Sequence, residues 1–157
     1  MKPGASSVRP PGDWLTKRPI CYDAAVSQTT DDALGALSRS VATHRGLRLL
    51  LLFGSRARRD AREGSDWDLG YLAGAEMDPS ALLLDVVTAL GTDRVDLVDL
   101  ARAGAQVRFR AAADGRIVYA ADETAFERFW FEAVLFWCDA APVIRMGYAD
   151  VLARLSP

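Results

Sequence analysis

Two aspartates one residue apart, Asp66 and Asp68, are the residues whose types and spacing most clearly suggest chemistry. Successive side chains of a β-strand point to opposite faces, so both carboxylates would project from one face while Trp67 points away. Neighbouring carboxylates repel each other, and a hard divalent cation such as Mg²⁺, which takes oxygen ligands, relieves that repulsion. The pair therefore indicates a metal site that works on phosphates.

A Gly-Ser pair, Gly54 and Ser55, stands ten residues before these aspartates and ends the apolar run Leu49–Phe53. The run is too short for a stable helix, so we expect a buried strand that stops at the glycine turn. Ser55 then opens a short basic helix, Arg56–Arg62, whose free N–H groups and dipole favour a phosphate. A phosphate cradle and a metal site would thus flank one short loop.

The two-part motif of Gly54-Ser55 and Asp66–Asp68 resembles the signature of the DNA polymerase β-type nucleotidyltransferases. Within that superfamily it is most similar to the minimal nucleotidyltransferases, small proteins often paired as antitoxins with a HEPN-domain toxin. The resemblance covers Leu47–Leu100 well and Ala101–Leu155 only in outline. It implies the nucleotidyltransferase fold, which agrees with the strand, helix, strand, helix, strand order of an α/β fold with a small mixed sheet flanked by helices.

The resemblance also implies a third carboxylate on a neighbouring strand, and the sequence offers two candidates. Asp96 lies between Val95 and Leu97 in an apolar strand, where an unpaired carboxylate is costly without a metal or hydrogen-bonding partner. Asp99 comes at the end of that strand, just before a helix expected from about Ala101, where it suits an N-cap. We therefore assign the third role to Asp96 and keep Asp99 as the alternative.

The family resemblance implies a metal-dependent transfer of AMP from ATP to a hydroxyl, with two Mg²⁺ ions as cofactors. The acceptor it implies is a tyrosine of a cognate HEPN ribonuclease toxin. The catalytic and metal-binding residues would be Asp66, Asp68 and Asp96, and the nucleotide-binding residues Gly54, Ser55 and Arg56. Two alternatives stay open: a small-molecule transferase of the aminoglycoside type, and a non-enzymatic module that binds a toxin.

An arginine cluster follows the Gly-Ser pair, and two interpretations of it are open. The cluster could attract a nucleoside triphosphate or an acidic acceptor, or it could be a solvated helix face balanced by Asp60 and Glu63. Arg59 stands where relatives often have glycine. The members of the cluster are Arg56, Arg58, Arg59 and Arg62.

Length and composition place the chain among ordinary globular proteins. It has 157 residues, 50% hydrophobic and 25% charged, with a net charge of −2, so we expect neither direct nucleic-acid binding nor attraction to membranes. Two cysteines, Cys21 and Cys138, without metal-ligand spacing favour a reducing cytoplasm, and no apolar run reaches the roughly 18 residues of a membrane span. We expect a flexible tail over 1–20, a core over 21–121 and a helical segment over 122–157.

Helical spacing predicts further elements around this core. A helix is expected over Thr29–His44, with Thr29 or Thr30 as its cap and His44, the only histidine, facing solvent or the helix dipole. The Asp78-Pro79 start predicts a second helix through Leu90. A helix over Ala101–Ala113 and a short strand over Arg116–Ala120 complete the core.

The last segment is unusually aromatic, with an apolar stripe that widens almost all the way round the helix. The stripe itself fits a core helix, whereas the surplus aromatic side chains favour a dimer or toxin-partner surface. Pro142 should kink or break this helix and leave a second piece over Ile144–Leu155. The apolar residues are Phe126, Phe129, Trp130, Phe131, Ala133, Val134, Leu135, Phe136 and Trp137.

Overall fold

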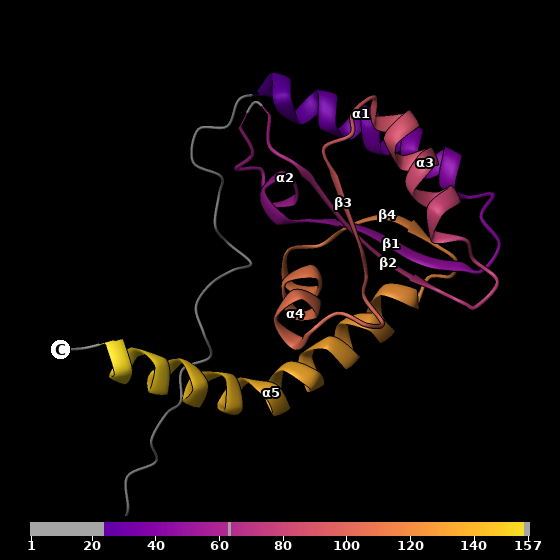
Figure 1. Ribbon diagram of the computed structural model, residues 1–157. Coiled ribbons are helices and arrows are strands. Elements are labelled where there is room, and N and C mark those ends of the chain that lie inside the picture. The colour runs from indigo at the N-terminus through magenta and orange to yellow at the C-terminus, as the bar shows by residue number, and fades with distance from the viewer. Residues whose placement is uncertain (1–23, 63, 156–157) are drawn as a thin grey trace, which may run out of the picture.

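A computed structural model describes residues 24–62 and 64–155, and its core is a four-stranded mixed sheet flanked by helices (Figure 1). The strand order is β3-β2-β1-β4; β1 is antiparallel to both neighbours, and β2 is parallel to β3. The predicted mixed sheet and helical C-terminal segment are confirmed. The elements are α1 (Ala24–Val41), β1 (Leu47–Phe53), α2 (Gly54–Arg58), β2 (Trp67–Ala73), α3 (Pro79–Leu90), β3 (Val95–Asp99), α4 (Ala105–Asp114), β4 (Arg116–Ala120) and α5 (Ala125–Leu155).

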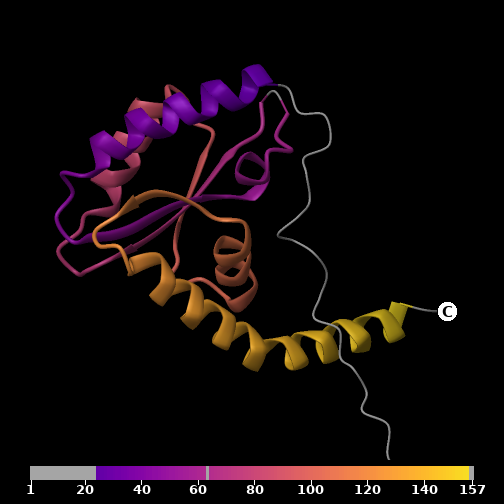
Figure 2. The same cartoon turned by 180° about the vertical axis from the view of Figure 1, so that it is seen from behind.

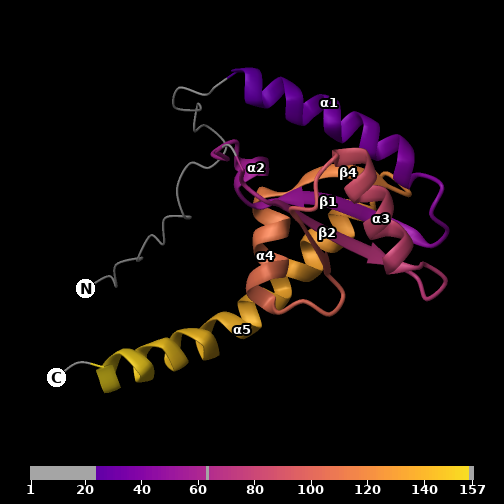
Figure 3. The same ribbon diagram turned by 45° about the horizontal axis from the view of Figure 1, so that its top comes forward.

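Helices cover both faces of the sheet, with α1 and α3 on one side and α4 and α5 on the other (Figures 1 and 3). The central strand β1 is buried almost throughout because it is covered on both faces. Its alternating side chains serve two separate apolar clusters. Leu50 and Leu52 pack with α1 and α3, whereas Leu49, Leu51 and Phe53 pack with α4 and α5.

Two predicted elements have nearly the predicted bounds, because local signals determine them. The side chain of Asp78 accepts a hydrogen bond from the Ser80 N–H (2.8 Å) at the start of α3, and Gly91 ends that helix with a φ of 65°. The strand predicted over Arg116–Ala120 is β4.

Other helix ends differ from the predictions. Helix α1 spans Ala24–Val41, so Thr29 and Thr30 lie inside the helix rather than at its N-cap position, and Thr30 is buried. Helix α4 begins at Ala105, after a turn, because Gly104 rather than Asp99 occupies its N-cap position. For α4, the cap-forming residue Asp99 lies six residues before the first helical residue, and Gly104 takes the N-cap position instead.

The C-terminal segment is one helix, α5, of 31 residues that continues through Pro142. The prediction of a break and of a separate helix over Ile144–Leu155 is therefore wrong. A proline removes one backbone hydrogen bond and crowds the preceding turn, which a helix can accommodate by bending. Figure 2 shows α5 curving along its length rather than stopping, with its distal half running away from the sheet.

His44 was predicted to face solvent or the helix dipole, and the solvent-facing alternative is wrong: its side chain is 12% exposed, and its Nε2 lies 2.8 Å from Oδ2 of Asp85 in α3. Cys138 on α5 is exposed with a free thiol. The tail predicted over 1–20, together with Cys21, falls outside the described residues. Within the described ranges, no helix is long and apolar enough to cross a membrane.

Candidate active site

Strands β2 and β3 bring Asp68 beside Asp96, the third predicted carboxylate. Asp68 is the second residue of β2, and in the parallel ladder between β2 and β3 its Cα partner is Asp96. Residues paired in a ladder point to the same face, so the two carboxylates stand next to each other on neighbouring strands. Asp66 lies just before β2, and the intervening Trp67 is 7% exposed, as the predicted alternation requires.

The carboxylates lie on the α4/α5 face of the sheet. In the antiparallel ladder, Asp68 is opposite Phe53, which belongs to the apolar cluster on that face. Asp66 and Asp96 are exposed and Asp68 is half-buried, so the group sits at the margin of the core. Asp99 is three residues beyond Asp96, and strand alternation directs it to the other face; its Oδ1 accepts a hydrogen bond from the Ala101 N–H (2.9 Å).

Burial and neighbouring charges both act on Asp68. Burial raises the pKa of its carboxyl group above the usual range, and the negative charges of Asp96 and Asp66 raise it further. The guanidinium groups of Arg110 in α4 and Arg58 in α2 act in the opposite direction. The three carboxylates therefore share one negative field, which a bound cation would relieve.

Gly54 connects the turn to this carboxylate. Its φ is +72°, a conformation that favours glycine, and a Cβ atom placed on it would overlap the carboxylate of Asp68. Any larger residue would push Asp68 away from its position. The glycine predicted as a turn residue is thus also the residue that lets β1 end against the Asp68 side chain.

Helix α2 is shorter than predicted, covering Gly54–Arg58 rather than extending to Arg62. It ends at Arg59, whose φ of 65° is left-handed, and the Asp60 N–H donates a hydrogen bond to the Ser55 carbonyl (3.0 Å). Glycine is the residue that adopts this C-cap conformation most readily, so the backbone at position 59 favours glycine over the arginine present.

Arg56 braces the loop that leads to the aspartates. Its Nη2 and Nε donate to the Ser65 carbonyl at 2.6 and 3.2 Å, and Nε also lies 3.2 Å from the Asp66 carbonyl oxygen. Its guanidinium group stacks 4.3 Å from the centre of the Trp67 ring. The structure thus places Arg56 behind the carboxylates, where it positions Asp66 and Trp67.

The rest of the arginine cluster is divided between ion pairs and solvent. Arg58 forms ion pairs with Asp60 and Asp114, each at 3.2 Å, so part of its charge is balanced as the solvated-face interpretation requires. Arg62 is exposed, and its backbone N–H donates to Ser65 Oγ. Glu63, the other predicted counter-charge, lies outside the described residues.

Arg110 is the residue that the sequence interpretation missed. Its positive charge acts to lower the pKa of Asp68 from α4, the helix that follows β3 and packs onto the same face of the sheet. A sequence signal existed in the two basic residues, Arg108 and Arg110, inside the helix after that strand.

Asp66, Asp68 and Asp96 offer the oxygen ligands that a divalent cation prefers, and the strand pairing places Asp68 beside Asp96. Their carboxylate groups do not point toward one common position. Within residues 24–62 and 64–155, no group of three His, Cys, Asp or Glu side chains is close enough to hold a metal ion. The carboxylates of Asp66 and Asp96 are exposed, and the pKa of Asp68 is raised first by burial and then by their negative charge, which a cation would offset. The residues present therefore fit Mg²⁺ as oxygen ligands.

Comparison with curated proteins found one related in sequence to more than half of the chain. The protein adenylyltransferase MntA of Aphanizomenon flos-aquae is 28% identical in an alignment of 95 residues, and the match covers 53% of this chain and 63% of the relative. The matched region thus spans less than two thirds of the relative's length.

Solved structures show the same fold. A chain of an MntA-HpeT toxin-antitoxin variant has a TM-score of 0.62 at 25% identity, covering 78% of this chain and 97% of the other. A complex of a tri-AMPylated Shewanella oneidensis HEPN toxin with its MNT antitoxin gives 0.59 at 23%, covering 80% and 98%. A protein described as a minimal nucleotidyltransferase gives 0.51 at 28%, covering 57% and 93%.

The family model that matches the chain is described as "Polymerase beta, Nucleotidyltransferase" and covers residues 36–124. That range runs from α1 through all four strands and includes Gly54, Asp66, Asp68 and Asp96. With more than half of its length matched, the chain belongs to the polymerase β-type nucleotidyltransferase family.

Proposed function

We propose that this chain is a protein adenylyltransferase that moves AMP from ATP to a hydroxyl group and releases pyrophosphate. The observation that carries the proposal is the ladder pairing of Asp68 with Asp96, beside Gly54 and two residues from Asp66, on one face of the sheet. Family membership and the likeness to an adenylyltransferase support the same activity.

Asp66, Asp68 and Asp96 are the residues that would hold Mg²⁺, of which two ions are proposed. When bound, these ions supply positive charge that offsets the charge on the transferred phosphoryl group and lowers the barrier to its displacement. Asp96 is exposed at the edge strand, where an acceptor can approach, and its role is to orient the acceptor hydroxyl and accept its proton.

The transfer itself is an in-line displacement at the α-phosphorus of ATP. The acceptor oxygen forms a bond to phosphorus while the bond to the oxygen that bridges to the β-phosphate breaks. Gly54 and Ser55 would receive the leaving phosphates on backbone N–H groups at the start of α2. The guanidinium groups of Arg110 and Arg58 add positive charge on the same side as Asp68.

We propose a tyrosine of a HEPN ribonuclease toxin as the acceptor, and α5 as the surface that meets this partner. In the structure, large apolar side chains stay exposed along α5 while Phe129 and Ala133 are buried against the sheet. Partner complexes of related fold contain a HEPN toxin, in one case AMPylated. The exposed side chains are Trp130, Phe131, Leu135, Phe136, Val143, Met146, Tyr148 and Val151.

The deciding experiment mixes the purified chain with Mg²⁺, α-labelled ATP and a co-expressed HEPN partner. The test variant is the Asp66→Asn, Asp68→Asn pair, which keeps side-chain shape and removes two charges. The matched control is Asp139→Asn on α5, an exposed aspartate outside the site. We expect label on the partner with the wild type and the control and none with the pair; substituting the modified tyrosine should abolish labelling.

The same experiment separates the alternatives. A pair variant that no longer labels the partner but still binds it supports the enzyme. A wild type that binds and silences the partner without label from any nucleoside triphosphate would replace the proposal with a binding module acting through α5. A parallel reaction with an added aminoglycoside tests the other alternative: label on the aminoglycoside and none on the protein would replace the proposal with the small-molecule transferase.

A further inference from the structure

A cavity of about 220 Å³ lies on the α4/α5 face of the sheet, away from the carboxylates. Leu49 of β1 and Leu72 of β2, which are paired in the antiparallel ladder, form its floor. Phe53 and Asp68 occupy the other end of the same ladder, four residues or about 13 Å along β1. The other lining residues are Arg48, Ala101, Arg108, Ala125, Arg128, Phe129 and Glu132.

The charged side chains that line this cavity are mainly positive, with three guanidinium groups and one carboxylate. Arg48 comes from β1 and donates from Nη2 to the Ala73 carbonyl (3.0 Å), while Arg108 comes from α4 and Arg128 from α5. Three separate elements therefore each contribute a cation to one small space. Such convergence favours an anion over a neutral ligand.

Arg108 is the innermost of the three. Its side chain is 15% exposed and lies over the rings of Phe129 and Phe136, 5.9 and 5.5 Å from their centres. Its Nη2 is 3.3 Å from Glu132 Oε2, a long contact. Its Nε–H is buried and has no hydrogen-bond acceptor among the described residues. A buried donor without an acceptor is unfavourable, and an oxyanion in the cavity would supply the acceptor.

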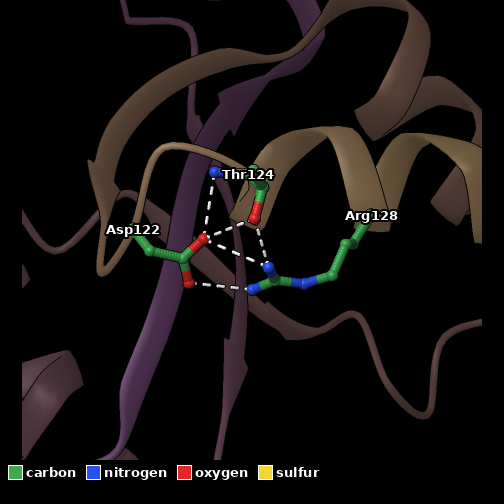
Figure 4. Close-up of polar contacts among 3 residues, drawn as sticks. All are labelled: Asp122, Thr124 and Arg128. Atoms are coloured by element: carbon green, nitrogen blue, oxygen red, sulfur yellow. Dashed lines mark hydrogen bonds and ion pairs between the residues drawn. The ribbon is translucent and has the colours of Figure 1, made fainter.

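Arg128 is held in place at the cavity by the turn before α5. Asp122 binds its guanidinium group through both oxygens, with Nη2 to Oδ2 at 2.8 Å and Nη1 to Oδ1 at 3.1 Å (Figure 4). Thr124 donates its N–H and hydroxyl to Asp122 and also contacts Arg128. The two contacts with Asp122 use only some of the five N–H donors of the Arg128 guanidinium group. The arrangement fixes the direction of the cation before any ligand arrives.

We propose that this cavity is a second binding site of the chain, which takes a small oxyanion such as a phosphate or carboxylate group. Its volume is below the 300 to 1,000 Å³ typical of pockets for drug-sized ligands. The anion binds against the Arg108 Nε–H, with Arg48 and Arg128 at its sides. The site uses none of the proposed catalytic residues, so it stands independently of the proposed function.

Two-dimensional ¹H–¹⁵N spectra of the full chain test the proposal, because arginine Nε–H groups give their own signals. Inorganic phosphate and malonate are titrated separately in metal-free buffer with a chelator, at constant ionic strength. Arg108→Gln identifies the Arg108 signal by its loss. Glu132→Gln removes the one carboxylate of the lining, and Arg145→Gln, an exposed arginine on distal α5, is the matched control.

The expected result is a saturable shift of the Arg108 Nε–H signal with one or both anions, at a Kd of about 1 mM or below. Arg108→Gln should weaken binding about tenfold, Glu132→Gln should tighten it a few-fold, and Arg145→Gln should leave it unchanged. The Glu132 variant keeps the test decisive if Arg108→Gln fails to fold, because Glu132 is 65% exposed. No saturable shift with either anion, or equal affinity in the wild type and Glu132→Gln, would overturn the proposal.

Discussion

Replacing Asp68 with asparagine should make the metal-free protein more stable, although the change disables a proposed catalytic residue. Asp68 is half-buried and its ladder partner is Asp96, so its ionised form is disfavoured in the fold by burial and by like charge. Asparagine has nearly the same shape and no charge. The substitution removes the repulsion and retains the packing.

The expected gain in the free energy of unfolding can be worked out from the distance between Asp68 and Asp96 in the strand ladder. Neighbouring strands lie about 4.8 Å apart, so the two charges are separated by about 5 Å. Coulomb repulsion at that distance is about 0.8 kcal/mol in water and about 3 kcal/mol at an effective dielectric constant of about 20. Because Asp96 is exposed, solvent screening favours the low end, and we expect about 1 kcal/mol. For a chain of this size, that raises Tm by about 2 to 4 °C.

The gain should depend on pH with a definite sign. The pKa of Asp68 is raised in the folded state, so the wild type keeps its full stability below the unfolded carboxyl pKa of about 3.9 and loses stability as pH rises through the folded value. The advantage of Asp68→Asn should therefore be small near pH 4 and complete at neutral pH. Added Mg²⁺ should stabilise the wild type more than the variant.

Thermal unfolding with a chelator, at several pH values, is the assay, with Asp139→Asn as the matched control. Asp139 is exposed on α5, and its substitution should leave Tm unchanged. If Asp68→Asn lowers the neutral-pH Tm in the absence of metal, the carboxylate is stabilised by partners rather than repelled, and the reasoning about a shared negative field fails.

Three further substitutions test local features of the fold by chemical denaturation. Gly54→Ala should cost about 2 kcal/mol because of its left-handed φ and its contact with Asp68, whereas Gly104→Ala, with open space around it, should cost far less; equal losses would contradict the close approach. Arg59→Gly should add about 0.5 to 1 kcal/mol by relieving a left-handed C-cap, and a loss would mean that the arginine side chain outweighs the backbone strain. Pro142→Ala should add up to about 3 kcal/mol and helical signal, since α5 continues through that position; no change in either would indicate that the helix stops there.

The parts of the fold predicted correctly are those where a local pattern has only one physical solution. Alternation along β2 separates Asp68 from Trp67, and it does so whatever the rest of the chain does. Gly91 ends α3, and Asp78 caps it, through bonds within a few residues. Asp96 was preferred to Asp99 because it lies between apolar strand residues; the ladder pairs Asp96 with Asp68, and its role as the third ligand stays a prediction.

Helix ends were predicted poorly because tertiary contacts determine them. Thr30 looks like a cap in sequence, yet it is buried within α1. The residue after it, Asp31, forms an ion pair with Arg116 of β4. Asp99 does bond to a backbone N–H, that of Ala101, but the chain there forms a turn rather than a helix. Whether a residue that can cap a helix does so therefore depends on where tertiary packing starts the helix, and a local sequence pattern does not give that position.

Helix α4 shows why charges around a site are harder to predict than its ligands. Arg108 and Arg110 are two residues apart, so they project about 200° apart around the helix axis. Once α4 packs on the sheet, Arg108 lines the cavity at the other end of the ladder, whereas the charge of Arg110 acts to lower the pKa of Asp68. The angle is contained in the sequence, but the rotation of the helix about its axis is set by apolar contacts such as Ala111. The two arginines therefore acquire separate roles only through the packing of α4.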